Sequence, residues 1–248
     1  MKTVKILMIG ASLCISALAL SSCGDDNEEQ PINVHEAIDL GLPSGTLWAD
    51  MNVGAAKPNE YGLFFAWGDT NGVTSDTTDG LTFSYATYKW TGEKRTQMDM
   101  TKYTTDDGKK MGGWYDADGN FIGDGKTVLE AEDDAAHAVW GGDWRMPTKE
   151  EVQELLDNTT SEWTTVDGIN GRKFMSKVND NYIFIPAAGC RDSTELAHQG
   201  SYGYYWSSSL NVTMSHIAIS LGFNEEKAYL GQHGFRYNRR SVRPVCKK

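Results

Sequence analysis

The sequence lacks the motifs of the common hydrolase and nucleotide-binding classes. It has no Gly-x-Ser-x-Gly turn, no His-Glu-x-x-His helix and no glycine-rich phosphate loop. Basic residues are also scarce, because 23 Lys and Arg stand against 34 Asp and Glu, a formal charge of -11 over 248 residues. Only the run RYNRR near the end is locally basic, and we interpret it as a final strand or loop with solvated arginines. Nucleic-acid binding needs a basic footprint, so the composition argues against it.

Cysteine is scarce as well, and its distribution limits the possible bridges. Of the four cysteines, Cys14 lies in the N-terminal apolar segment and Cys23 directly after it, which leaves Cys190 and Cys246. In an exported protein these two either form a disulfide or stay as independent, partly buried thiols. Their spacing does not resemble a zinc site, and we predict no metal and no cofactor.

Residues 1–22 have the pattern of a secretory signal peptide. Lys2 and Lys5 precede an apolar run from Ile6 to Leu20 that is too short for a comfortable membrane span. The segment ends in LSSC, which resembles the lipobox of bacterial lipoproteins. This resemblance implies that Cys23 is lipidated and anchors the mature chain to the membrane; a plain signal peptide with a free Cys23 is the alternative.

Residues 23–34 are predicted to form a flexible acidic tether. The sequence GDDNEEQPINV is polar and offers almost nothing to bury. Its acidic residues also resemble the surface-export signal of Bacteroidetes lipoproteins, which implies an outer-membrane, cell-surface location. Removing Lys2 and Lys5 with the signal peptide leaves 21 basic residues against 34 acidic ones, so the anchored domain should repel anionic surfaces.

The stretch WGGDWRMPTKEEVQELL predicts the end of one helix and the start of another. We expect a helix over Asp133–Trp140 that ends at Gly141, because glycine reaches the left-handed conformation without steric cost. Thr148 and Glu151 then form a Thr-x-x-Glu capping box, and apolar residues follow at helical spacing, at Val152, Leu155 and Leu156.

Most of the remaining sequence predicts antiparallel strands. Turn residues at 43–45 and 179–181 each separate two β-like runs, and residues 224–227 make another turn. Apolar and small residues alternate over 217–223, which predicts a half-buried strand. Pro244 suggests a final strand near a sheet edge or a bulge, and residues 82–111 show no clear period. The expected fold class is α+β, with antiparallel sheets and two central helices in one domain over 35–248.

One acidic run alternates much as calcium ligands do, at Asp116, Asp118, Asn120 and Asp124. An EF-hand loop needs glycine at its sixth position and glutamate at its twelfth, where this chain has Phe121 and Thr127. Asp-Gly-Asn between aromatic flanks is also a common hairpin turn. We therefore predict a turn here, with calcium as the alternative.

Six ordered blocks resemble the Fibrobacter succinogenes major paralogous domain of exported Bacteroidetes proteins. They are GLPSGTLWADMNVGA, YGLFFAWGDT, EDDAAHAVWGGDWRMPTKEEVQELL, IFIPAAGCRD, GSYGYYWSSS and RRSVRPVC. That family is similar in fold to C-type-lectin-like proteins, including sulfatase-modifying factors and the variable proteins of diversity-generating retroelements. The resemblance implies a C-type-lectin-like fold and surface display, but no particular activity.

Two functions of those related proteins do not transfer to this chain. Calcium-dependent lectins use Glu-Pro-Asn or Gln-Pro-Asp, whereas Lys57-Pro58-Asn59 lacks the acidic ligand and lies at the wrong end of the domain. Sulfatase-modifying enzymes need a reactive cysteine pair, and Cys190 and Cys246 fall outside any matching motif.

The retroelement proteins display ligand-binding residues in the carboxy-terminal part of the fold. Here that part contains planar amides, rings and one arginine, which suit binding because tyrosine gives large contact area at low entropic cost. The same residues are also ordinary polar loop residues in many proteins. The candidates are Asn211, His216, Asn224, Tyr229, Gln232, His233, Arg236, Tyr237 and Asn238.

The sequence as a whole favours a non-catalytic lipoprotein that binds an extracellular glycan, peptide or surface protein. The alternatives are an extracellular enzyme acting on glycans or proteins, and a structural accessory of a surface assembly. A deep pocket with convergent carboxylates favours the enzyme, a shallow face of Tyr, Asn and Arg favours binding, and an exposed apolar groove favours assembly.

Overall fold

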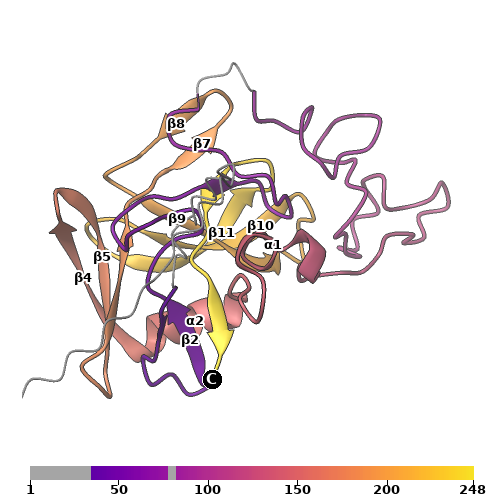
Figure 1. The fold of residues 1–248 in the computed structure, drawn as a ribbon. Coiled ribbons are helices and arrows are strands. Elements are labelled where there is room, and N and C mark those ends of the chain that lie inside the picture. The colour runs from indigo at the N-terminus through magenta and orange to yellow at the C-terminus, as the bar shows by residue number, and fades with distance from the viewer. Residues whose placement is uncertain (1–34, 78–81) are drawn as a thin grey trace, which may run out of the picture. The chain divides into compact units, whose positions relative to one another are not determined.

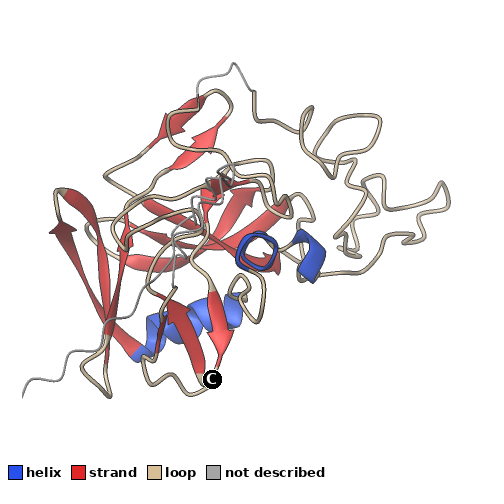
Figure 2. Cartoon of the chain, viewed as in Figure 1, coloured by secondary structure: helices blue, strands red, loops and turns tan. Residues whose placement is uncertain are grey.

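The computed structural model describes residues 35–77 and 82–248, without the side chains of Gln232 and His233. The expected signal peptide, the lipidation at Cys23 and the tether therefore lie outside the described residues. The described part is mostly β-structure with two short helices (Figures 1 and 2). Within this part, no helix has the length and apolar character needed to cross a bilayer.

The largest sheet has five strands in the order β11-β10-β9-β12-β3. Neighbouring strands run antiparallel, except that β12 pairs with β9 in parallel. The strands are β3 (Phe64–Phe65), β9 (Gly203–Leu210), β10 (Ile217–Phe223), β11 (Ala228–Phe235) and β12 (Arg240–Ser241). Segments from both ends of the domain thus meet in this sheet, which agrees with the expected antiparallel architecture.

Three smaller sheets complete the β-structure. The first joins the predicted hairpin around residues 43–45 to the last strand, in the order β1-β2-β13. Pro244 precedes β13, which lies at the edge of this sheet, as its sequence predicts. Its strands are β1 (Ala37–Ile38), β2 (Thr46–Ala49) and β13 (Val245–Lys247). The second sheet consists of β4 (Thr159–Val166), β5 (Ile169–Ser176) and β6 (Tyr182–Pro186). The third pairs β7 (Cys190–Asp192) with β8 (Glu195–Ala197).

The first helix ends where the sequence predicts. Helix α1 (Ala135–Trp140) follows a single 3-10 turn, η1 (Ala131–Asp133), and ends at Gly141, whose φ is 68°. The helix begins two residues later than expected because Asp134 is its N-cap and accepts hydrogen bonds from two backbone N–H groups. The ring of His35 stacks on Trp140, with 3.5 Å between centroids, so the first described residue is held against this helix.

The second helix starts with the predicted capping box. In α2 (Lys149–Asn158) the Thr148 hydroxyl accepts from the Glu151 N–H, and the Glu151 carboxylate accepts from the Thr148 N–H. The same carboxylate receives two guanidinium nitrogens of Arg145, at 2.6 and 2.7 Å. Helix α2 packs against strands β9, β10 and β11, and its Val152 and Leu155 are fully buried in the main core.

Strand β10 is buried along its whole length, which corrects the expectation of a half-buried strand over 217–223. Leu221 and Phe223 lie in the main core together with residues of α2. On the other face of the strand, Ser220 and Gly222 are small enough to be covered by the side chains of neighbouring strands. A central strand with small residues on its second face is therefore buried on both sides.

The irregular residues 82–130 are held against the five-stranded sheet by a buried arginine. Arg236 is 0% exposed and donates hydrogen bonds to the backbone oxygens of Lys102, Tyr103 and Ser215. Its guanidinium also lies 4.9 Å from the centroid of Trp67. The interpretation of RYNRR as solvated arginines is therefore wrong, because Arg236 and Arg240 are both buried.

The acidic run at 116–124 forms the predicted turn. Tyr115 and Phe121 pair across it, and the Asp116 carboxylate accepts from the backbone N–H groups of Asp118 and Asn120. Asp124 points elsewhere, since it accepts from the backbone N–H groups of Tyr103 and Thr104. These carboxylates close their own backbone turns, as Asp residues commonly do in loops.

The two remaining cysteines do not form the disulfide that was one of the two expectations. Cys190 begins β7 and Cys246 lies in β13, and both are free thiols. The alternative of two independent, partly buried thiols therefore describes them. Burial raises the pKa of both thiols, which disfavours the reactive thiolate at neutral pH.

Candidate functional site

One face of the five-stranded sheet carries partly exposed tyrosines on neighbouring strands. Gly222 of β10 pairs with Tyr204 of β9 on one side and with Tyr229 of β11 on the other. Directly paired residues of a sheet share a face, so the two tyrosines flank the glycine. A Cβ at position 222 would lie 2.5 Å from the Tyr229 ring, which shows that this ring lies over the glycine. We name this surface the tyrosine face.

The tyrosine face continues into the residues that precede β9. Tyr202 and Tyr204 are two residues apart and stack with 5.8 Å between centroids and 7° between planes. His198 meets the edge of Tyr202 at 5.1 Å. Tyr202, Tyr204 and Tyr229 are all partly exposed, whereas Trp206, the next residue of this face, is 1% exposed. The partly exposed tyrosine rings are therefore followed on the same face by a buried tryptophan.

A buried cation lies over two rings of this face. The guanidinium carbon of Arg240 is 4.3 Å from the Trp206 centroid and 5.1 Å from that of Tyr204. Such stacking over aromatic faces stabilises a guanidinium electrostatically. Burial together with neighbouring groups raises the pKa of Tyr204 to about 12, so its phenol stays protonated and can donate a hydrogen bond. The face thus combines flat apolar rings, hydroxyl donors and a positive charge.

A second group of rings lies where β11 ends. Phe235 and Tyr237 stack with 5.6 Å between centroids, and Tyr85 meets Tyr237 at 4.8 Å. His216 stacks on Phe235, and its pKa is lowered by burial and by nearby cations, which favours the neutral imidazole. Phe235 is 39% exposed. This group brings together two sequence candidates, His216 and Tyr237.

Other sequence candidates are placed in structural roles. Arg236 is fully buried and its guanidinium donates to four acceptors of the protein itself, so it does not present its side chain to a ligand. Asn238 is 6% exposed and lies within the fold. The Asn224 carboxamide oxygen accepts from the N–H groups of Glu226 and Lys227 and closes the predicted turn. The side chains of Gln232 and His233 lie outside the described residues.

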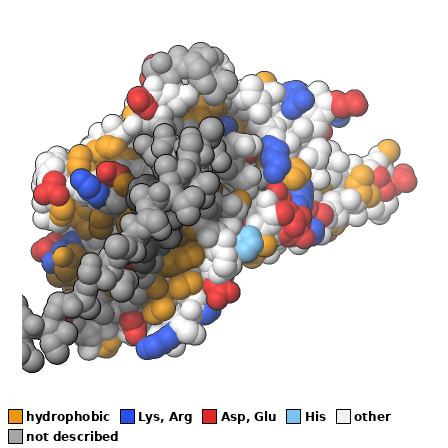
Figure 3. Space-filling view, viewed as in Figure 1, with side chains coloured by type: hydrophobic (Ala, Val, Ile, Leu, Met, Phe, Trp, Pro, Cys, Tyr) orange, Lys and Arg blue, Asp and Glu red, His pale blue; other side chains and the backbone are white. Residues whose placement is uncertain are grey.

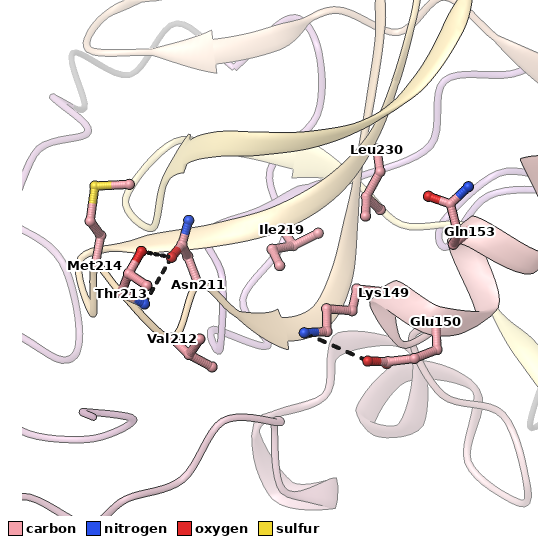
Figure 4. A pocket seen from close by; sticks show the side chains of 9 residues that line it. All are labelled: Lys149, Glu150, Gln153, Asn211, Val212, Thr213, Met214, Ile219 and Leu230. Carbon is pink, nitrogen blue, oxygen red and sulfur yellow. Dashed lines mark hydrogen bonds and ion pairs between the residues drawn. The ribbon is translucent and has the colours of Figure 1, made fainter. Parts of the chain in front are cut away.

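Asn211 lies at a cavity of about 440 Å³ between the start of α2 and the loop that joins β9 to β10. Figure 4 shows Ile219 and Leu230 on the sheet, with the Lys149–Glu150 ion pair on the helix. The Asn211 oxygen accepts from the N–H and hydroxyl groups of Thr213, so it is committed to its own loop. Asn211 therefore does not join the tyrosine face.

A cavity of about 590 Å³ lies beside β1 and β6 and has four acidic residues in its lining: Glu36, Asp50, Asp167 and Asp180. Within the described residues, however, three acidic ligand atoms approach one another only at Glu130, Glu132 and Asp133. At that cluster the Lys102 ammonium lies 2.6 to 3.5 Å from all three carboxylates. A lysine ammonium thus provides the positive charge at this acidic cluster. Figure 3 shows acidic and basic side chains lying next to one another on one face of the molecule.

Sequence reasoning missed Tyr202, Tyr204, Phe235 and Arg240. The alternation of Tyr202, Tyr204 and Trp206 in GSYGYYWSSS could have indicated that the first two share a face with Trp206. No local signal places Arg240 over Tyr204 and Trp206, because β12 joins β9 by a pairing that connects distant parts of the chain.

Comparison with known proteins gives one partial match. A family model described as a domain of unknown function (DUF8237) matches residues 156–245. This region is less than half of the chain, and it includes the tyrosine face. Searches against curated proteins and against solved structures returned no match.

Proposed function

We propose that this protein is a surface-tethered, non-catalytic binding lipoprotein of C-type-lectin-like fold. Its lipid anchor is Cys23 and its location is the outer membrane, facing outward. The domain binds an extracellular ligand, which is a glycan, a peptide or a neighbouring surface protein. The fold proposal draws support from the mostly antiparallel β-structure with two short helices and from strand β13 pairing beside the first hairpin.

The observation that carries this proposal is the tyrosine face. Tyr202, Tyr204 and Tyr229 expose flat rings on or next to adjacent strands instead of burying them. Tyrosine anchors binding surfaces because its ring offers apolar contact while its hydroxyl remains available for hydrogen bonds. Tyr204 and Tyr229 lie on strands and Tyr202 directly precedes β9, so little conformational freedom is lost on binding. A shallow aromatic face of this kind suits binding better than catalysis.

The sequence candidate Tyr229 belongs to this face, and Tyr237 belongs to the second group of rings at the end of β11. The proposal thus moves the binding surface from carboxy-terminal loops towards the strands β9 and β11. Among binding ligands, a glycan fits well, since the apolar face of a sugar ring can lie flat on a tyrosine while its hydroxyl groups meet the phenol.

The test is binding of the full chain, purified in detergent, to arrays of neutral and acidic glycans and to extracts of cell-surface proteins. Tyr204→Ala and Tyr229→Ala should each weaken binding by about ten-fold, the usual effect of truncating an aromatic anchor. Tyr182→Ala is the matched control, because Tyr182 is 52% exposed on a different sheet.

Circular dichroism of each variant monitors the fold. Binding that survives both Tyr204→Ala and Tyr229→Ala, or that falls equally with Tyr182→Ala, would contradict the assignment of the tyrosine face. Absence of binding to every glycan and every extract would contradict the binding function itself.

A further inference from the structure

Arg240 has fewer partners than its burial requires. The residue is 8% exposed, and among the described side chains its guanidinium has one hydrogen-bond acceptor, the Ser220 hydroxyl oxygen at 2.7 Å from Nη1. The Nε atom is buried and has no hydrogen-bond partner. Within the described residues, no carboxylate lies within ion-pair distance of this guanidinium. A buried cation with unused donors is costly, because it has lost water without gaining replacements.

The other buried arginines show how this chain normally satisfies such a group. Arg236 donates to four acceptors, and Arg191 and Arg243 each donate to three, most of them backbone oxygens. These arginines tie segments of the fold together. Arg240 lacks that set of carbonyl acceptors, so a purely structural role does not account for it.

The position of Arg240 is nevertheless well defined. Its guanidinium lies over Trp206 and Tyr204, and Gly234 of β11 leaves room for it, since a Cβ there would lie 2.8 Å from Cζ. A planar guanidinium held by stacking keeps its remaining donors in one orientation. Such preorganisation strengthens binding, because the side chain is already ordered before a ligand arrives.

Few acidic groups offset this charge. Burial lowers the pKa of Arg240, and the Cys190 thiol, the phenols of Tyr204 and Tyr229 and the carboxylate of Asp192 act in the opposite direction. Asp192 is the only carboxylate among them, and it is exposed and interacts with Tyr237. On the opposite side, the Lys227 ammonium lies 5.9 Å from the Tyr229 centroid and adds a second positive charge to the face.

We infer that Arg240 is the subsite for an oxyanion of the ligand, namely the carboxylate of a uronic acid in an acidic glycan. This inference rests on the proposed binding function of the tyrosine face and specifies its ligand class. The sugar ring lies on Tyr204 and Tyr229, and its carboxylate meets the spare donors of the guanidinium. A guanidinium presents two parallel N–H groups that match a carboxylate, which a neutral sugar cannot exploit.

The experiment compares oligogalacturonate with its methyl ester, which has the same shape without the charge. Both are titrated by calorimetry against the full chain in detergent. The unaltered protein should bind the acid at least about ten-fold more tightly than the ester, and Arg240→Met should remove that preference. Lys173→Met is the control, because Lys173 also lies over a tyrosine, Tyr182, but on another sheet.

Equal affinity for acid and ester in the unaltered protein would overturn the inference while leaving the binding function intact. If Arg240→Met still bound the acid more tightly than the ester, the inference would also be overturned. If Arg240→Met fails to fold, Arg240→Lys is used instead, because it keeps the positive charge but lacks the two parallel N–H groups of the guanidinium. It should still reduce the preference for the acid over the ester.

If neither sugar binds, the proposed ligand class fails, and inorganic sulfate still tests the subsite separately. Sulfate should shift the Nε–H resonance of Arg240 in a ¹⁵N-resolved NMR spectrum, whereas sodium chloride at equal ionic strength should not. An unshifted resonance would contradict an oxyanion subsite at Arg240.

Discussion

Replacing Glu151 with glutamine should destabilise the domain by about 2–3 kcal/mol at pH 7. The Glu151 side chain is 7% exposed and accepts two hydrogen bonds from the Arg145 guanidinium. It also accepts from the Thr148 N–H and from the Thr46 hydroxyl, so it joins α2, the turn before α2 and strand β2. Glutamine keeps the shape but loses the charge that all of these donors face.

The magnitude follows from the pKa of this carboxyl. Burial acts to raise the pKa of Glu151, but the Arg145 and Thr148 donors outweigh it and lower the pKa from 4.5 to about 2. A difference of about 2.5 pKa units corresponds to about 3 kcal/mol at 1.36 kcal/mol per unit. Arg145 is 33% exposed, and water screening reduces this to the lower figure of about 2 kcal/mol.

The sign of the pH dependence is fixed by the lowered pKa. The contribution of Glu151 is fully present above about pH 4.5 and is lost as the pH falls towards 2, where the folded-state carboxyl becomes protonated. The assay is urea unfolding at pH 7, 4 and 2.5. Between pH 7 and pH 2.5 the free energy of unfolding should fall less in Glu151→Gln than in the unaltered protein.

The control is Glu150→Gln, because the neighbouring Glu150 is 69% exposed and pairs with Lys149 at 3.6 Å. It should change stability by less than about 0.5 kcal/mol. If Glu151→Gln matches this control at pH 7, or if its loss of stability towards pH 2.5 parallels that of the unaltered chain, the reasoning is refuted.

Three other perturbations probe the sheet and its cover. Gly222→Ala should displace the Tyr229 ring, costing about 1–3 kcal/mol in urea unfolding and weakening ligand binding; unchanged binding would mean that this ring position is irrelevant. Arg236→Met should cost more than about 2 kcal/mol, because backbone oxygens of residues 102, 103 and 215 lose their donor, and proteolysis should then cut within residues 82–130. Without reductant, Cys190 and Cys246 should both react with iodoacetamide, slowly in the folded protein and rapidly after unfolding. A disulfide-linked pair of peptides in the mass spectrum would contradict the free thiols.

Both helices could be predicted from sequence because their signals are local. The capping box of Thr148 and Glu151 and the helix stop at Gly141 depend on neighbours within a few residues. The burial of β10 was predicted wrongly for the opposite reason. Whether Ser220 and Gly222 are covered depends on side chains from β11 and β12, which pairing brings together from distant positions.

The candidate site was predicted only in part. Tyr229 could be selected by its residue type, but Tyr204 and Arg240 belong to the site through strand pairing, which the sequence does not display. Arg236 was misplaced because its acceptors are backbone oxygens, and these carry no signature of residue type. Polar residues in a carboxy-terminal region thus indicate binding only after their burial is known.

The first hairpin has a mechanical consequence for a domain held by its amino-terminal side. Tension applied at His35 would load first the stack on Trp140 and then the two residue pairs of β1, which is an edge strand of its sheet. Strand β2 remains held on its other side by three pairs to β13. The pairs of β1 are therefore the first strand contacts that a pull on the amino-terminal side would load, before any contact of the sheet that carries the tyrosine face.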